Sequence, residues 1–314
     1  MKSFQPVDLK KVKTHSLKGR KSLVERTGLG SPWKASGYFH EFLESLPDIL
    51  AGRDFKEIVR HLGAAHRGGK VIVWGIGAHV IKVGLSPILI DLMDQGFVTC
   101  IALNGAGVIH DVEMAMTGKT SEDVAAELDA GEFGMAEETA SFINTAVSRG
   151  VHNGLGLGEA VGKALMETAF PYLNESLLAS AVSRGIPATV HVAMGTDIIH
   201  MHPSCDGAAF GEGSHRDFRL FTDVVSHLQE GVYLNVGSAV ILPEVFLKAL
   251  NVARNLGFDV SSFSTVAMDF IRHYRPMTNV AQRPVVKGGK GYTLIGHHEI
   301  MVPLLAAAVK EEVR

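Results

Sequence analysis

The sequence predicts an α/β protein with a largely parallel sheet and helices on both faces. Two observations carry this prediction. Apolar, β-rich segments alternate with helical segments along most of the 314 residues, which is typical of repeated strand–helix–strand units. The first two strand-like segments also end in turns of small residues, Gly75-Ile76-Gly77 and Asn104-Gly105-Ala106-Gly107. Such turns lie at the carboxyl ends of strands, where open parallel sheets bind ligands.

The first half of the chain is predicted to consist of helices around one strand–helix–strand unit. Apolar residues three and four positions apart predict a helix over 39–62. The strand–helix–strand unit covers 71–111. A further helix is expected to begin at 120–123, where Thr-Ser-Glu-Asp offers an N-cap and an acidic first turn.

The stretch that follows is mainly helical in its pattern. The pentapeptide AVSRG occurs there twice, at 146–150 and 181–185, and we expect each copy to end a helix with Arg in the last turn and Gly after it. Gly154, Gly156 and Gly158 lie between the two copies. A phosphate-binding loop would follow a strand, so a flexible connection between helices is the favoured interpretation.

Strand–helix alternation resumes after residue 185. Strands are predicted over 188–194, 232–236, 264–267 and 292–295, and helices over 216–228, 243–255 and 299–313. The whole pattern is Rossmann-like. Because no Pro/Ser-rich linker interrupts it, we expect a single domain over 37–314, preceded by an irregular basic arm over 1–36 that packs on the body or on a neighbouring subunit.

The composition limits the classes of function. A net charge of −3 argues against a dedicated nucleic-acid binder. The basic first 21 residues lack the apolar core of a signal peptide, and no later apolar run has the length of a membrane span, so we expect a cytoplasmic protein without membrane partners. Cys100 and Cys205 lie far apart in the sequence, which disfavours a disulfide framework.

The densest polar cluster follows the strand predicted at 188–194. His200, His202 and Asp206 lie within seven residues and are suitable in type for zinc or another divalent ion. Their spacing matches no strong zinc signature. Two alternatives stay open: the histidines bond structural carbonyls, or they act singly as acids and bases near neutral pH.

Two further groups could carry chemistry. His297 lies where the last predicted strand meets the closing helix, at the same sheet edge as the glycine turns. Lys287 and Lys290 flank a glycine pair and could grip an anion or act as a nucleophilic amine, although a solvated loop is the simpler interpretation. At the first turn, glycines let backbone N–H groups approach a phosphate. Because Val80 stands where a complete GxGxxG needs its third glycine, an ordinary tight turn explains the residues equally well.

Over roughly residues 70–312 the chain resembles the deoxyhypusine synthase family, in the order and spacing of its motifs. The matching segments are GIGAHVIKVG (75–84), LNGAGVIHD (103–111), IPATVHVAMGTD (186–197), VGSAV (236–240), AQRPVV (281–286) and YTLIGHHEIMVPLLAAAV (292–309). Members of that family are homotetramers that use NAD and pass an aminobutyl group from spermidine, through a lysine imine, to a protein lysine.

The resemblance implies an NAD site and a homo-oligomer, by analogy a tetramer. The implied contacts are Ala78, His79, Asn104, Gly105, Ala106, Asp197, Gly237, Ser238, Thr265 and His297. The turn glycines Gly75, Gly77 and Gly107 complete the expected cofactor set.

The departures from the family pattern concern the substrate. The family's paired glutamates become Ile109 and His110, and the acids that grip the polyamine become His202, Asn279 and Val286. The family's catalytic histidine falls near Pro243. A buried polycation needs carboxylates. We therefore expect a changed substrate and no true deoxyhypusine synthase.

Three hypotheses follow. The first is an NAD-dependent enzyme for a small amine or amino acid, in which His202 and His297, with His200 nearby, move protons, and Lys287 or Lys290 forms an imine. The second is a metal-assisted hydrolase or lyase that uses His200, His202 and Asp206. The third is a non-catalytic nucleotide-binding protein.

Overall fold

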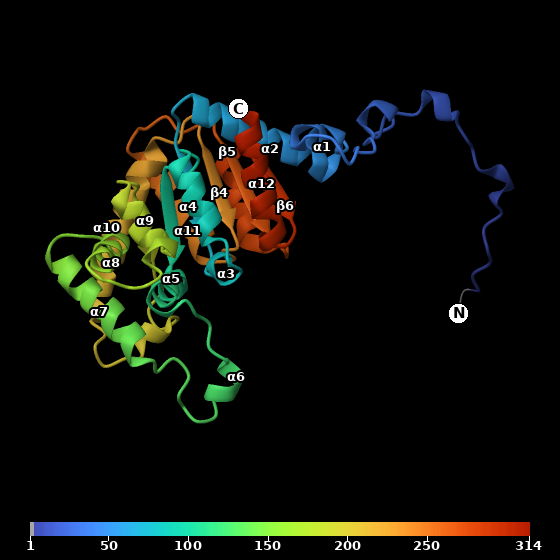
Figure 1. Ribbon diagram of the computed structural model, residues 1–314. Coiled ribbons are helices and arrows are strands. Elements are labelled where there is room, and N and C mark those ends of the chain that lie inside the picture. Colours follow the sequence, from blue (N-terminus) through green and yellow to red (C-terminus); the bar gives the residue numbers. More distant parts are fainter. Residues whose placement is uncertain (1–2) are drawn as a thin grey trace.

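The computed structural model describes residues 3–314 and contains one six-stranded sheet, in which all neighbouring strands are parallel (Figure 1). The strands are β1 (Ile72–Ile76), β2 (Cys100–Asn104), β3 (Ala188–His191), β4 (Val232–Val236), β5 (Ser264–Asp269) and β6 (Lys290–Ile295). Their order in the sheet is β3-β2-β1-β4-β5-β6. The predicted α/β, Rossmann-like architecture is confirmed.

Helices cover both faces of the sheet. One face carries α2 (Leu50–Arg67), α4 (Ser86–Asp94), α5 (Gly105–Thr117), α9 (Leu177–Ser183) and α12 (His298–Glu312). The other carries α10 (Gly207–Ser226) and α11 (Ile241–Asn255). Near the β3 edge lie α7 (Glu137–His152) and α8 (Leu157–Met166), and the short helices are α1 (Phe39–Ser45), α3 (His79–Lys82) and α6 (Val124–Glu127).

The central strands read as continuous apolar runs because both of their faces are buried. Every residue of β1 is buried. Ile72, Trp74 and Ile76 belong to the core beneath α2 and α4, whereas Val73 belongs to the core beneath α10 and α11. This is the pattern expected of a parallel sheet between two helical layers.

Four predicted helix boundaries differ from the structure. The helix expected over 39–62 is two helices, because Pro47 disfavours helical backbone at Leu46. Helix α10 begins nine residues before Arg216, where the Asp206 carboxylate caps it. Helix α6 is only four residues long. The AVSRG copies also differ, since α9 ends as predicted but α7 continues past Gly150 to His152.

Gly150 stays inside α7 because another helix lies against it. A Cβ atom added there would lie 2.2 Å from the Ala160 Cβ of α8. We expect Gly150→Ala to lower the free energy of unfolding by about 1–3 kcal/mol through overpacking. Gly211, inside α10, has open space at the same position, so Gly211→Ala is expected to raise stability by about 0.5–1 kcal/mol through helix propensity. Urea denaturation of the two variants tests this; changes of the same sign would contradict it.

The segment before α1 differs in character from the rest of the chain. Residues 3–36 contain three 3₁₀ turns and no buried side chain. They extend away from the body (Figure 1), and contact it near residues 28–31, where Ser31 N donates to Ser45 O (3.0 Å) and Asp48 N to Gly28 O (3.0 Å). The division into an arm over 1–36 and a domain over 37–314 stays a prediction. None of the helices within residues 3–314 is long and apolar enough to cross a membrane.

Asp217 and Asp111 are buried carboxylates that join separate elements. Asp217 of α10 accepts hydrogen bonds from Gly158 N (2.9 Å) at the start of α8 and from Val190 N (2.8 Å) of β3. Asp111 of α5 caps the start of α9, where it accepts from Ser176 Oγ (2.6 Å) and Leu177 N (2.7 Å). Burial raises the pKa of Asp217 to about 7 and that of Asp111 to about 6.

Candidate functional site

The strand order reverses direction along the chain between β1 and β4, and the carboxyl ends of these strands define the switch point of the sheet. Gly77 follows β1, and its N–H donates to Val236 O at 2.8 Å. A Cβ atom on Gly77 would lie 2.1 Å from Gly237 O. The two βα turns therefore approach each other as closely as backbone permits, and this approach requires glycine at position 77.

A buried histidine lies directly beside this switch point. His298 begins α12, is 0% exposed, and has no hydrogen-bond partner for either ring nitrogen among the described residues. Its Nε2 lies 3.7 Å from Oδ1 of Asp269, the last residue of β5. A Cβ atom on Gly237 would lie only 2.8 Å from the same nitrogen. Buried polar groups without partners are rare in folded proteins, so these two nitrogens point to a missing ligand.

Aromatic rings surround His298 on the solvent side. The centroid of His79, at the start of α3, lies 5.9 Å from that of His298 and 5.9 Å from that of Phe270. Phe270 in turn stacks on His297, with the ring planes 2° apart. The side chain of His297 is 68% exposed. The site is thus a buried imidazole and carboxylate beneath a partly exposed aromatic rim.

Burial sets the charge state of the buried histidine. It lowers the pKa of His298, and the nearby Asp269 carboxylate opposes that shift only in part. His79 and His297 also lower this pKa, and Glu299 raises it. Near neutral pH the imidazole is therefore uncharged, with one donor nitrogen and one acceptor nitrogen.

This shift predicts a pH-dependent contribution to stability. Below the ordinary histidine pKa of 6.5, the unfolded chain binds a proton at His298 that the folded protein does not bind. Stability should therefore fall as the pH decreases below 6.5. We expect His298→Gln to make the free energy of unfolding less steeply dependent on pH below that value. Urea titrations of both proteins between pH 7 and pH 5 test this, and identical slopes would contradict it.

A second polar group lies at the carboxyl end of β2. Asn104 caps α5 and accepts a hydrogen bond from Gly107 N at 3.0 Å. Asp197 lies against the same turn, because a Cβ atom on Gly105 would be 2.1 Å from its Oδ2 and because it accepts a bond from Ala106 N. Burial raises the pKa of Asp197. The structure thus brings Asp197 to the end of a neighbouring strand, beside residues predicted from sequence to bind a cofactor.

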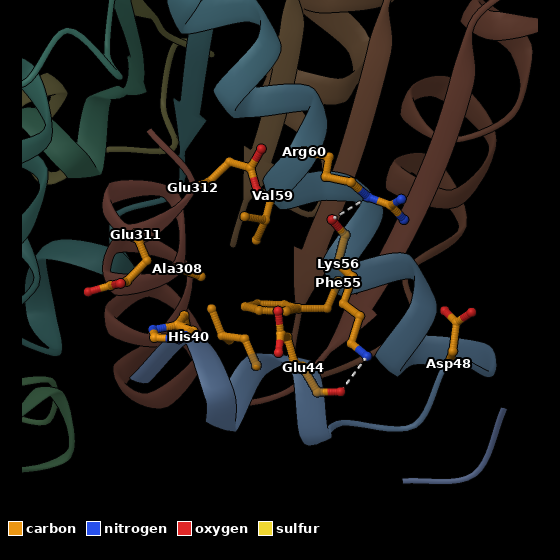
Figure 2. A pocket seen from close by; sticks show the side chains of 11 residues that line it. His40, Glu44, Asp48, Phe55, Lys56, Val59, Arg60, Ala308, Glu311 and Glu312 are labelled. Atoms are coloured by element: carbon orange, nitrogen blue, oxygen red, sulfur yellow. Dashed lines mark hydrogen bonds between the residues drawn. The ribbon is translucent and has the colours of Figure 1, made fainter. Parts of the chain in front are cut away.

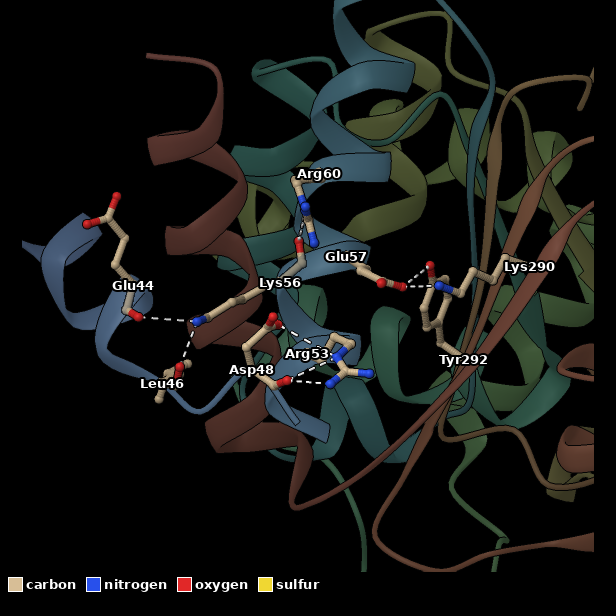
Figure 3. Close-up of polar contacts among 9 residues, drawn as sticks. All are labelled: Glu44, Leu46, Asp48, Arg53, Lys56, Glu57, Arg60, Lys290 and Tyr292. Carbon is tan, nitrogen blue, oxygen red and sulfur yellow. Dashed lines mark hydrogen bonds and ion pairs between the residues drawn. The ribbon is translucent and has the colours of Figure 1, made fainter. Parts of the chain in front are cut away.

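The structure does not bring the predicted nucleophiles Lys287 and Lys290 to this edge of the sheet. Lys290 is the first residue of β6, at the amino edge of the sheet, and Lys287 precedes it. The six residues of this strand separate its two ends by roughly 17–20 Å. Figure 3 shows that Lys290 forms an ion pair with Glu57 of α2, which also accepts a hydrogen bond from Tyr292 Oη (2.9 Å).

Two of the predicted cofactor residues make packing contacts inside the sheet. Thr265 is near the amino end of β5, fully buried, and donates to Val280 O at 2.8 Å. It therefore lies at the opposite end of its strand from the candidate site. Gly75 is inside β1, near its carboxyl end, and a Cβ atom there would lie 2.7 Å from Tyr233 Oη.

The predicted metal set does not assemble. Within residues 3–314 no three His, Cys, Asp or Glu side chains are placed to hold an ion. His200 Nδ1 accepts from Gly195 N (3.2 Å), His202 Nδ1 lies 2.7 Å from Ser204 Oγ, and Asp206 caps α10. Local turns and caps therefore engage the Nδ1 atoms of both histidines and the Asp206 carboxylate, whereas His200 Nε2 is buried without a hydrogen-bond partner among the described residues. His202 Nε2 faces Glu137 of α7 (3.9 Å), so it lies beside the helical layer at the β3 edge and away from the His298 group.

Sequence reasoning missed two residues of this site. Asp269 was overlooked because the predicted strand stopped at Ala267, two residues before the end of β5. Sequence reasoning selects His297 and not its neighbour His298, because both follow the same predicted strand. An acidic residue directly after an apolar strand was the signal that could have identified Asp269.

Comparison with known proteins supports the fold. No protein-family model and no curated protein sequence match this chain. Three solved structures share its fold. ArgZ, a cyanobacterial arginine dihydrolase, is 16% identical, with a TM-score of 0.52 over 84% of this chain and 33% of ArgZ. AgrE in complex with ornithine and NAD+ is 14% identical, with a TM-score of 0.52 over 84% of this chain and 34% of AgrE. A candidate LOR/SDH protein from Methanococcus maripaludis S2 is 13% identical, with a TM-score of 0.50 over 82% of this chain and 69% of that one.

These similarities establish the fold alone. The chain spans about a third of the length of ArgZ and of AgrE. A candidate deoxyhypusine synthase from Entamoeba histolytica, 10% identical, matches 89% of this chain and 95% of its own with a TM-score of 0.49, a level from which we draw nothing. Membership in the deoxyhypusine synthase family stays a prediction.

Proposed function

We propose that this protein is an NAD-dependent enzyme for a small amine or amino acid, with its active site at the carboxyl edge of the sheet. The observation that carries the proposal is His298, a fully buried histidine with two unpartnered ring nitrogens beside the switch point of the sheet. This position is where open parallel sheets bind nucleotides and where a polar ligand would satisfy the imidazole.

The residues present fit a dinucleotide. Gly77 and Gly237 keep the first and fourth βα turns free of side chains. Asp197 lies at the end of β2, where an acidic residue of a Rossmann-type site bonds a ribose hydroxyl. The partly exposed Phe270 offers a flat face to a ring. The AgrE structure with this fold was determined with ornithine and NAD+, which supports both the cofactor and the substrate class.

The protein's own residues would hold the substrate and move one proton. NAD supplies, when bound, an acceptor for two electrons from the substrate carbon. Neutral His298 can take a proton from a substrate amine or hydroxyl group, because its pKa lies below the ordinary value and its acceptor nitrogen is free. Asp269 would stabilise the imidazolium that forms, since its carboxylate lies 3.7 Å from Nε2.

Titration calorimetry with NAD+ is the first test, followed by measurement of NADH formation with a panel of amines and amino acids. The proposal expects binding and turnover with at least one amino donor. Binding without turnover across the panel would favour the alternative of a non-catalytic nucleotide-binding protein. The distance of Lys287 and Lys290 from this edge of the sheet supports that alternative. Absence of NAD+ binding would contradict the proposal.

A matched pair of glycine substitutions tests the location of the cofactor. Gly237 and Gly257 both have positive φ, 72° and 92°, so alanine at either position costs about 1–2 kcal/mol of backbone strain. Only at Gly237 does the added Cβ meet another group, namely His298 Nε2, whereas Gly257 has open space. We expect Gly237→Ala to weaken NAD+ binding about tenfold or more and Gly257→Ala to leave it unchanged. Equal affinities in calorimetry would contradict this location.

A further inference from the structure

The N-terminal arm, defined here as residues 3–36, exposes apolar side chains that a folded protein normally covers. The exposed fractions are 92% for Phe4, 73% for Leu9, 70% for Leu17 and 90% for Leu23. Asp8 and Ser16 each cap a short turn that presents a leucine followed by lysine, at Leu9–Lys11 and Leu17–Gly19. An arm with this many exposed apolar groups is suited to pack against another surface.

The arm also carries a charge opposite to that of the remaining chain. Residues 1–36 contain nine Lys and Arg against two Asp and Glu, so the other 278 residues contain 21 against 31. The arm is therefore strongly basic and the body distinctly acidic. This asymmetry favours association of the arm with an acidic part of a body.

A pocket of about 550 Å³ lies among α1, α2 and α12, on the opposite side of the fold from the proposed active site. Figure 2 shows Phe55 and Val59 of α2 and Ala308 of α12 around its interior. Leu43 completes the apolar part. The polar residues at its rim are His40, Glu44, Asp48, Lys56, Arg60, Glu311 and Glu312.

The basic residues of this rim donate hydrogen bonds to backbone carbonyl oxygens. Lys56 Nζ donates to Leu46 O (2.6 Å) and to Glu44 O (3.2 Å), and Arg60 Nε donates to Lys56 O (3.3 Å), as Figure 3 shows. Across the described part of the chain, Glu44 has no ion-pair partner, and Glu311 has only the exposed Arg314 (3.7 Å). The pocket thus combines an apolar interior with carboxylates that are available to an incoming cation.

We propose that this pocket receives the segment 9–24 of the arm from a second copy of the chain. The segment complements the pocket: its leucine and valine side chains suit the apolar interior, and its lysines and arginine suit the carboxylates of Glu44 and Glu311 at the rim. Backbone bonds at Gly28 and Ser31 fix the root of the arm near the pocket rim, while the rest leads away from its own body (Figure 1). The 25 residues from 3 to 27 span up to about 80 Å when extended, enough to reach a neighbouring subunit. Reciprocal exchange of two arms gives a closed, symmetric dimer.

Sedimentation of the full-length chain tests the proposal through charge reversal. The combined variant Lys10→Glu, Lys11→Glu and Lys13→Glu is expected to raise the dissociation constant of the assembly about tenfold or more. A control that reverses Lys119, Arg219 and Lys287, which are exposed on the body, changes the net charge equally and should leave assembly intact. Adding Glu44→Lys and Glu311→Lys to the arm variant should restore it. A monomeric wild type, or an assembly that the arm variant leaves intact, would overturn the proposal.

Cross-linking distinguishes a second copy from the arm's own body. A chain with Leu17→Cys is mixed with a chain with Glu44→Cys, and a disulfide-linked pair of the two is expected on oxidation. A single chain that carries both substitutions should likewise link between chains. A link confined within one chain would assign the pocket to the same copy's arm and overturn exchange.

Discussion

His298→Gln is expected to lower the turnover of an amino substrate by at least about 100-fold, the contribution typical of a positioned general base. The reason is its placement: the ring is buried beside Asp269, with both nitrogens free and with the pKa lowered by burial. Glutamine retains hydrogen-bonding capacity at this position but cannot carry the proton. Steady-state kinetics with NAD+ measures the effect.

The neighbouring residue supplies the control. His297 has a largely exposed side chain that faces Glu299 at 3.7 Å, and we expect His297→Gln to change turnover by less than about fivefold, which is under 1 kcal/mol. A denaturation curve of each variant shows whether the fold is retained. Comparable losses of turnover in both variants would show that His298 has no specific role in the reaction. A loss confined to His297→Gln would instead support the prediction made from the sequence.

Asp217→Ala is expected to cause the largest loss of stability, about 3–5 kcal/mol, because it leaves buried N–H groups without acceptors. The carboxylate joins α10 to Gly158 of α8 and to Val190 of β3. Both of these hydrogen bonds are buried. Chemical denaturation at neutral pH gives the change in the free energy of unfolding.

Asp217→Asn separates the hydrogen bonds from the charge. The N–H groups of Gly158 and Val190 donate to the same oxygen, Oδ2, so an amide oxygen can accept them and the loss should be only about 1–2 kcal/mol. Because burial raises the pKa of Asp217 to about 7, the folded protein binds a proton there between about pH 4 and pH 7 that the unfolded chain releases. The stabilisation that Asp217 contributes relative to asparagine should therefore decrease as the pH rises through that range. Equal losses for the alanine and asparagine variants would show that packing, not hydrogen bonding, sets the cost.

Most of the fold could be predicted from local pattern. Strand β4 occupies the predicted residues 232–236, and α12 is displaced from its prediction by one residue. Buried parallel strands are apolar throughout and end in small-residue turns, so their signal is strong within a few residues. One misplaced boundary depends on contact between two helices, since Ala160 of α8 packs on Gly150 and α7 continues past it.

The site could be predicted only in outline. The turns at Gly77 and Gly237 mark the correct edge of the sheet, because parallel strands share the direction of their ends. The choice between His297 and His298 depends on which ring faces Asp269, which is 29 residues before His298 in the sequence. The position of Lys290 could not be predicted either, because it depends on a residue distant in the sequence. Lys290 lies at the amino edge of the sheet, where it forms an ion pair with Glu57.

The structure shows the surroundings of three residues that depart from the deoxyhypusine synthase pattern. Asn279 donates to Glu244 (2.8 Å) and accepts from Arg283 (2.8 Å), so it belongs to a packed polar network. His110 lies 2.6 Å from Thr120 Oγ1, in a group with Glu113. Val286 is exposed. Each of these three residues therefore has its own local environment in the fold.

A crystal structure of the protein grown with NAD+ tests the central claim most directly. The account predicts a dinucleotide across the turns at Gly77 and Gly237, with a polar group of the ligand within hydrogen-bond distance of a His298 ring nitrogen and with a ribose near Asp197. A dinucleotide bound at any other surface, or crystals that stay free of it at concentrations that saturate the protein in solution, would contradict the claim.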